Sequence, residues 1–221
     1  MSHSKACRIV VLISGSGTNL QALIDAQQQG QLPVHIGCVI SNKPGVAGLA
    51  RADHAGINTE VVDHKRFTER EQFDQQLIDA IDQYQPDLVV LAGFMRILTA
   101  GFVRHFQGKM LNIHPSLLPK YQGLHTHKRA LEAGDTTHGV TVHFVTEELD
   151  GGPPIIQAIV PINQGDTETS LAKRVQAQEH IIYPMAVSWF AQQRLVMEGN
   201  KALLDGEPLP PTGSLIDSRQ H

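Results

Sequence analysis

The 221-residue sequence has only two cysteines and no apolar run of the roughly 18 residues that a membrane-spanning helix needs. Cys7 and Cys38 lie in apolar, strand-like segments, so we expect buried free thiols rather than a disulfide framework. The first five residues carry no apolar signal-peptide region. We therefore expect a cytoplasmic protein that does not bind a membrane.

An excess of basic charge is also missing, since 18 Lys and Arg stand against 22 Asp and Glu, for a net charge of −4. The basic residues are scattered, so we expect no nucleic-acid partner. The 12 histidines lack the ligand spacing of a zinc site, which predicts that no metal is bound. No Gly-x-Ser-x-Gly elbow is present and neither cysteine stands at a helix start, so the sequence offers no signature of a serine or cysteine nucleophile.

The first half of the chain alternates between strand-like and helix-like segments. Thr68 and Glu71 have the spacing of a capping box, and the helix that follows them carries an apolar stripe ending at Tyr84. This alternation predicts an α/β fold with a doubly wound, mostly parallel sheet. The predicted strands span residues 8–13, 34–40, 58–62, 87–91 and 110–114. The other predicted helices span residues 20–28, 47–54 and 101–106.

The pattern changes after Pro119. A helix is predicted over 127–133, and two strands over 137–145 and 155–162 are close enough in sequence to pair antiparallel at the end of the sheet. A long helix runs from Asp166 or Thr167, either of which can cap it, toward residue 193, and Pro184 is expected to kink it. We assign residues 1–209 to a single domain and residues 210–221 to a flexible tail.

Asn112 and His114 interrupt the apolar strand at 110–114. Residues two apart on a strand point to the same side, so an amide and an imidazole project together. Pro115 cannot continue the ladder, which puts both groups at the carboxyl end of the strand, where open α/β sheets bind ligands. The other interpretation is a buried Asn and His whose hydrogen bonds are satisfied within the protein.

The segment 14–19 joins the first strand to a helix start, where backbone amides and the helix dipole favour an anion. Leu20 occupies the third glycine position of a dinucleotide fingerprint, and the second strand does not end in an acidic residue. A single phosphate, as on a mononucleotide, fits this loop best. A plain glycine turn is the alternative.

Asp150 lies in a glycine-flanked turn after a strand. A carboxylate that meets His114 would orient the imidazole and favour its charged form. An aspartate before two glycines is also a common turn residue, and the spacing alone does not show that the two side chains meet.

Four segments of the chain follow one another in a characteristic order. They are Ser14-Gly15-Ser16-Gly17-Thr18-Asn19, Ala92-Gly93-Phe94-Met95-Arg96-Ile97-Leu98, Asn112-Ile113-His114-Pro115-Ser116-Leu117-Leu118-Pro119 and Glu148-Leu149-Asp150-Gly151-Gly152. Together they resemble the phosphoribosylglycinamide formyltransferase family, and the resemblance extends from about Cys7 to about Pro211. The segment 112–119 is common to folate-dependent formyl-transfer enzymes, and the glycine loop narrows the resemblance to the ribonucleotide enzymes.

The resemblance implies a Rossmann-like formyltransferase fold, with a phosphate-binding N-terminal half and a folate-binding C-terminal half. It also implies the site residues. The catalytic residues are Asn112, His114 and Asp150; the ribonucleotide-binding residues are Gly17, Thr18, Asn19 and Glu179; and the folate-binding residues are Arg70, Met95, Arg96, Ile97, Leu98 and Asn112. Ser16, Gln122 and Pro154 depart from the family pattern without touching a catalytic role.

The activity that the resemblance implies is formyl transfer from 10-formyltetrahydrofolate, as cosubstrate, to the amino group of 5'-phosphoribosylglycinamide in purine biosynthesis, without a metal. Asn112 and His114 would stabilise a tetrahedral oxyanion, and Asp150 would orient and charge His114. A formyltetrahydrofolate deformylase, another folate-dependent formyltransferase such as the methionyl-tRNA enzyme, and a non-enzymatic phosphometabolite-binding module stay open as alternatives. We expect small molecules as the only substrates and a monomer or a homodimer.

Overall fold

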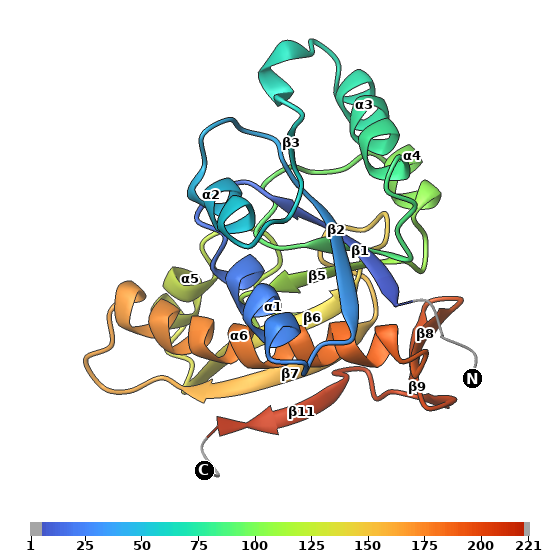
Figure 1. Cartoon of the computed structure of the whole chain (residues 1–221). Helices are drawn as coiled ribbons and strands as arrows, with labels where there is room; N and C mark the ends of the chain where they lie inside the picture. The colour runs from blue at the N-terminus through green and yellow to red at the C-terminus, as the bar shows by residue number, and fades with distance from the viewer. Residues whose placement is uncertain (1–5, 219–221) are drawn as a thin grey trace. The chain divides into compact units, whose positions relative to one another are not determined.

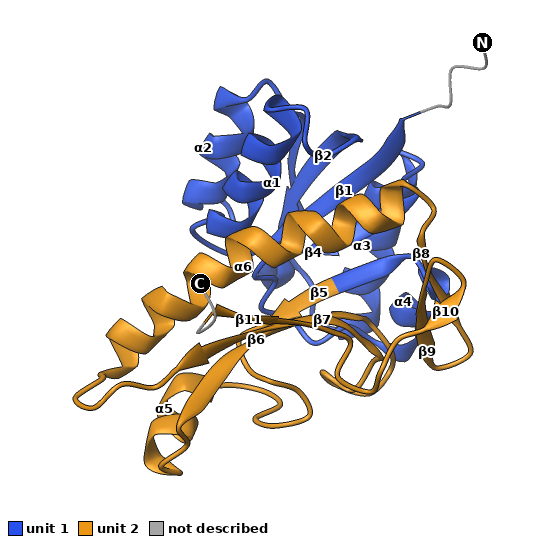
Figure 2. Cartoon of the chain, turned by 90° about the horizontal axis from the view of Figure 1, so that it is seen from below, with its two compact units in different colours: residues 1–111 blue, residues 112–221 orange. Residues whose placement is uncertain are grey.

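A computed structural model of the chain describes residues 6–218, and its contacts divide the chain after Leu111 into two units (Figure 2). Unit 1 ends at Leu111 and unit 2 begins at Asn112. The assignment of residues 1–209 to one domain stays a prediction.

Unit 1 is built on parallel strands in the order β4-β1-β2-β3. Leu12 of β1 pairs with Ile40 of β2 and with Leu91 of β4, and the residues from Ile9 to Ile13 are wholly buried. Apolar side chains on both faces of β1 are therefore covered, as expected for a continuous apolar run. The strands are β1 (Cys7–Ile13), β2 (Val34–Ser41), β3 (Thr59–Val61) and β4 (Leu88–Leu91).

Helices flank the strands of unit 1 on both faces. Helices α1 and α2 pack together on one face, and α3 and α4 pack together on the other (Figures 1 and 2). The predicted apolar stripe of α3 is buried at Phe73, Leu77 and Ile81. The bounds are α1 (Thr18–Gln28), α2 (Ala47–His54), the 3-10 turn η1 (His64–Arg66), α3 (Arg70–Asp82) and α4 (Ala100–His105).

The predicted capping box at Thr68 is wrong. Helix α3 has Glu69 at its N-cap position, and no side chain caps it. With the helix starting at Arg70, its third residue is Gln72 rather than Glu71, so the Thr68 and Glu71 side chains are out of register with the two amides that a box must satisfy.

Unit 2 has the strand order β11-β7-β6-β5, and β6 pairs with β7 antiparallel, as predicted. Helix α6 packs on both β6 and β7 (Figure 2). Thr167 caps α6 in a reciprocal box with Ser170, and the helix continues through Pro184. The elements are β5 (Met110–His114), which spans the unit boundary, α5 (Thr126–Glu132), β6 (Thr137–Phe144), β7 (Pro154–Pro161) and α6 (Glu168–Ala191).

The end of the chain differs from the prediction of a flexible tail over 210–221. Strand β11 (Ser214–Asp217) pairs in parallel with β7. Backbone hydrogen bonds to β7 supply the order that the local composition does not predict. Residues 219–221 lie outside the described part of the chain. A separate antiparallel sheet, which the sequence did not reveal, is formed by β8 (Leu195–Glu198), β9 (Lys201–Leu204) and β10 (Glu207–Pro208).

The predicted fold class is confirmed: the fold is α/β, with a mostly parallel sheet, flanking helices and an antiparallel part toward the C-terminal end. None of the helices among residues 6–218 combines the length and the hydropathy that crossing a bilayer requires.

Candidate active site

The carboxyl end of β5 carries the predicted pair of polar side chains. Asn112 is half-buried and His114 is buried, and the intervening Ile113 points to the opposite side of the strand. The strand stops at His114, before Pro115, as the sequence predicted.

His114 is held between two oxygen acceptors. Its Nε2 lies 2.8 Å from the carbonyl oxygen of Tyr121, and its Nδ1 lies 3.4 Å from Oδ2 of Asp150. A carbonyl oxygen only accepts, so Nε2 carries a proton. The ring is therefore oriented by the carbonyl of Tyr121 on one side and faces the carboxylate of Asp150 on the other.

Asp150 is fixed by its backbone and by a second donor. Its φ of 50° is in the left-handed region, and its Oδ2 accepts a hydrogen bond of 2.9 Å from the backbone N–H of Gly123. The segment from Tyr121 to Gly123 thus contacts both members of the pair, accepting from His114 and donating to Asp150. The two side chains, which the sequence alone could not place together, do meet.

Gly152 explains why the turn after Asp150 is rich in glycine. A Cβ at this position would overlap the carbonyl oxygen of Phe144, at the end of β6. Only glycine lets the two backbones approach this closely. The close approach ties the loop that bears Asp150 to the strand beside it.

His143 is a member of this cluster that sequence reasoning missed as a site residue. Its Nδ1 donates to the carbonyl of Phe144 at 2.8 Å, and its Nε2 lies 3.1 Å from Nδ2 of Asn112 and 3.9 Å from Oδ1 of Asp150. Burial lowers the pKa of His143 to about 4, so the ring is neutral near pH 7 and Nε2 is an acceptor. Nδ2 of Asn112 must therefore face His143, which fixes the orientation of the amide.

A pair of histidines, of which His138 is buried and His127 half-buried, lies in the same unit. Nε2 of His138 is 3.2 Å from Nδ1 of His127. Burial, followed by the neighbouring His127, lowers the pKa of His138 to about 4, and burial also lowers the pKa of His127. These rings are structural groups that stay neutral near pH 7.

We expect the free energy of unfolding to fall as the pH decreases from 6.5 toward 4. The unfolded chain protonates His138 and His143 near their ordinary pKa of 6.5, whereas the folded chain protonates them only near 4. The unfolded state binds more protons in this window, so acid favours it, by about 1.4 kcal/mol for each histidine and each pKa unit.

Urea denaturation across this pH range measures the effect. His138→Gln should reduce the slope, whereas His35→Gln, which changes an exposed histidine of β2, should leave it as in the wild type. An unchanged slope in His138→Gln would show that this ring does not stay neutral in the folded chain.

The predicted phosphate loop lies in unit 1. Gly17, with a φ of 71°, is the N-cap residue of α1, and no side chain caps this helix. A Cβ on Gly17 would come within 2.6 Å of the Cα of Gly48, at the start of α2. The carbonyl of Ser16 accepts a hydrogen bond of 2.8 Å from Nε of Arg51. Thr18 and Asn19 therefore lie in the first turn of a helix whose N-terminal end is held in place by contacts with Gly48 and Arg51 of α2.

The predicted folate residues other than Asn112 lie in unit 1, and Asn112 is the first residue of unit 2. Arg70 is exposed at the first residue of α3. Met95 and Ile97 are 63% and 56% exposed, which is unusual for large apolar side chains, and Leu98 is half-buried. The guanidinium of Arg96 lies 5.8 Å from the centre of the Phe73 ring.

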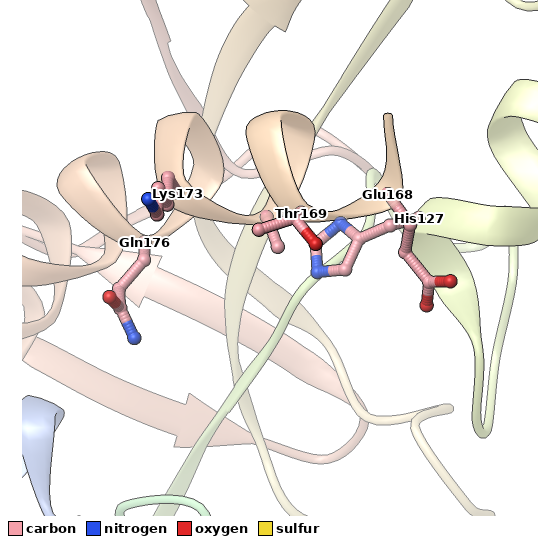
Figure 3. Close-up of a pocket in the computed structure, with 6 residues that line it drawn as sticks. His127, Glu168, Thr169, Lys173 and Gln176 are labelled. Atoms are coloured by element: carbon pink, nitrogen blue, oxygen red, sulfur yellow. The ribbon is translucent and has the colours of Figure 1, made fainter. Parts of the chain in front are cut away.

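Glu179, the remaining predicted residue, lies half-buried on α6. A pocket of about 350 Å³ lies along the start of the same helix (Figure 3). Glu179 comes one turn after Gln176, the last residue of that pocket. The pocket is lined by His127, Glu168, Thr169, Ala172, Lys173 and Gln176.

Among residues 6–218, no three His, Cys, Asp or Glu side chains gather closely enough to hold a metal ion. The groups that lie together at the end of β5 are an imidazole, an oriented amide and a carboxylate. Such a set can stabilise negative charge and move protons.

The family model described as formyl transferase matches residues 7–187. The chain therefore belongs to the formyl transferase family of enzymes. Among its relatives is the phosphoribosylglycinamide formyltransferase of Escherichia coli, which is 57% identical over 209 residues, covering 95% of this chain and 99% of that protein.

A solved structure of the phosphoribosylglycinamide formyltransferase of Coxiella burnetii superposes with a TM-score of 0.92 and is 53% identical, covering 96% of this chain and 100% of that one. The human trifunctional purine biosynthetic protein adenosine-3 is 49% identical over 189 residues, which are 86% of this chain and 19% of that protein.

Proposed function

We propose that this chain transfers the formyl group of 10-formyltetrahydrofolate to the amino group of 5'-phosphoribosylglycinamide, a step of purine biosynthesis. The observation that carries the proposal is the convergence of Asn112, His114 and Asp150, whose side chains contact one another directly or through His143. The high identity to phosphoribosylglycinamide formyltransferases over almost the whole chain supports the choice of substrates.

The reaction begins when the amine attacks the formyl carbon. A C–N bond forms and the carbonyl oxygen becomes an oxyanion. Nδ2 of Asn112 carries two protons, one of which faces His143, so the second is available to the oxyanion. The positive charge of the His114 ring lies on the same side of β5 and stabilises the negative charge.

Collapse of the intermediate breaks the bond between the formyl carbon and N10 of the folate. The attacking amine loses a proton and N10 gains one, so the protons balance within the site. Asp150, at 3.4 Å from Nδ1 of His114, keeps the ring charged and oriented and helps this proton movement. The distance exceeds the about 2.7–2.9 Å of a tight charge-assisted bond, so the pair must come closer before a proton passes between the two side chains.

The ribonucleotide is held by its phosphate at Gly17, Thr18 and Asn19, with Glu179 contacting the rest of that substrate. The folate is held by Arg70 and by the segment Met95–Leu98, whose exposed Met95 and Ile97 suit a flat apolar ring. The products are small molecules, and the enzyme acts in the cytoplasm as a monomer or a homodimer.

Absorbance measurements of tetrahydrofolate release, with and without the ribonucleotide, test this proposal. Release that requires 5'-phosphoribosylglycinamide supports it. Release with water alone would identify a formyltetrahydrofolate deformylase, and no release would indicate a non-enzymatic phosphometabolite-binding module.

Replacing Asn19 by alanine should raise the KM for the ribonucleotide about tenfold or more, because a contact to a charged phosphate is lost. The kcat and the KM for the folate should stay within about twofold of the wild-type values, because the lost contact binds the ribonucleotide equally in the ground state and in the transition state. Gln27→Ala, at the opposite end of α1, is the control. An unchanged KM for the ribonucleotide in Asn19→Ala would show that the phosphate does not bind at this loop.

A further inference from the structure

The segment Met95–Leu98, which joins β4 to α4, contains no helix or strand. It nevertheless presents two large apolar side chains, Met95 and Ile97, to solvent. A segment without a hydrogen-bond ladder keeps one conformation only if other groups bind its backbone. Two buried side chains from remote parts of unit 1 do so, one at each end.

Ser14 binds the first end. Its Oγ accepts a hydrogen bond of 2.8 Å from the backbone N–H of Met95 and donates one of 2.6 Å to Oδ1 of Asn42. Ser14 and Asn42 are 4% and 1% exposed. The hydroxyl proton is committed to Asn42, so a lone pair of Oγ is directed at Met95.

Asp74 binds the second end. Its Oδ2 accepts a hydrogen bond of 2.6 Å from the backbone N–H of Thr99, the N-cap residue of α4. Asp74 is only 2% exposed although it is a carboxylate of α3. Buried carboxylates are rare unless a specific contact keeps them there.

We propose that Ser14 and Asp74 are positioning residues that hold the folate-binding segment Met95–Leu98 in its binding conformation. The inference rests on the proposed function for the identity of the ligand. Ser14 is the first residue of the predicted phosphate loop, but its hydroxyl contacts Met95 of the folate-binding segment. The proposal therefore gives Ser14 a role that its position in the sequence does not indicate.

The chain offers a matched control in Ser41. This serine is also wholly buried at the end of a parallel strand, and its hydroxyl also makes one donated and one accepted hydrogen bond. Both of those bonds go to Lys43, within the turn after β2. Ser41→Ala therefore removes the same groups as Ser14→Ala without releasing Met95.

Amide hydrogen exchange of the protein without substrates tests the contacts directly. We expect the Met95 amide to exchange about tenfold faster in Ser14→Ala and the Thr99 amide about tenfold faster in Asp74→Ala, because each loses its acceptor. Ser41→Ala should leave both unchanged. Asp74→Asn, which keeps an acceptor oxygen, should restore slow exchange at Thr99. Met95 exchange that is unchanged in Ser14→Ala would overturn the proposal.

Steady-state kinetics test the consequence for binding. Ser14→Ala and Asp74→Ala should each raise the KM for 10-formyltetrahydrofolate about five- to tenfold, with the ribonucleotide KM within about twofold. Asp74→Asn and Ser41→Ala should behave as the wild type. A rise in the ribonucleotide KM of Ser14→Ala, instead of the folate KM, would overturn the positioning role and make Ser14 part of the phosphate site.

If Asp74→Ala does not fold, the comparison of Ser14→Ala with Ser41→Ala decides the proposal by itself. The wild-type assay separates this proposal from the function on which it rests. A wild-type enzyme that does not formylate the ribonucleotide contradicts the function, whereas the exchange rates at Met95 and Thr99 still decide whether the two side chains hold the segment.

Discussion

Replacing His114 by alanine is expected to lower kcat by a factor of about 10²–10³, the usual cost of removing one group that stabilises an oxyanion. The loss follows from the position of the ring, which is buried, faces Asp150 and projects beside Asn112. Binding of the ribonucleotide should be largely kept, because its phosphate is assigned to the loop of unit 1. Steady-state turnover and the dissociation constant of the ribonucleotide measure the two quantities separately.

His105 provides the control for that variant. It also pairs with a carboxylate, since its Nε2 lies 2.9 Å from Oδ2 of Asp82. The two side chains are 43% and 48% exposed, so solvent screens them and His105→Ala should leave turnover unchanged. Near-normal turnover in His114→Ala would show that the imidazole takes no part in the mechanism, whatever turnover the His105→Ala control has.

The contrast between these two pairs shows why distance alone does not identify a site. The contact of His105 with Asp82 is shorter than that of His114 with Asp150. Burial, a second acceptor on the ring and a neighbouring amide distinguish the latter. A loose contact in a nearly dry environment influences charge more than a close contact in water.

The strands and their faces could be predicted because their signals are local. The apolar runs of β1 and β4 and the alternation at Asn112 and His114 depend on a few consecutive residues. The capping box at Thr68 failed although its signal is also local, because the helix begins at Arg70, one residue later than a box with Thr68 at the N-cap requires. Strand β11 could not be predicted, since its partner β7 lies far away in the sequence.

The site residues divide in the same way. Asp150 was already a candidate partner of His114 from its glycine-flanked turn, but only the resemblance to a family assigned it a catalytic role, since the spacing could not show that the two side chains meet. His143 was visible as one position of an alternating strand, and only its register at the end of β6, facing Asn112, reveals its role. The contact of Ser14 with Met95 joins residues 81 positions apart, which no short motif encodes.

Replacing Asp150 by asparagine should lower kcat by about 10³ or more while leaving the fold intact, as the matching change does in a serine-protease triad, where the factor is about 10⁴. The amide oxygen can still accept from the backbone N–H of Gly123, and the amide nitrogen then takes the place of Oδ1, on the side of His143. The same oxygen faces Nδ1 of His114, but the negative charge beside the ring is gone, so the imidazolium loses the carboxylate that favours it. We therefore expect a neutral His114 ring whose one proton stays on Nε2, where it donates to the carbonyl oxygen of Tyr121.

The variant therefore removes the charge of the site and keeps its shape. Nitrogen-15 spectra of the His114 ring should show an imidazolium in the wild type and the neutral Nε2–H tautomer in Asp150→Asn near pH 7. Asp205→Asn, which makes the same exchange in an exposed pair with Arg194, should change neither the spectrum nor the turnover. A neutral His114 with wild-type turnover would show that formyl transfer does not use the ring charge, whereas a slow variant with a charged ring would assign the loss to proton transfer by Asp150 itself.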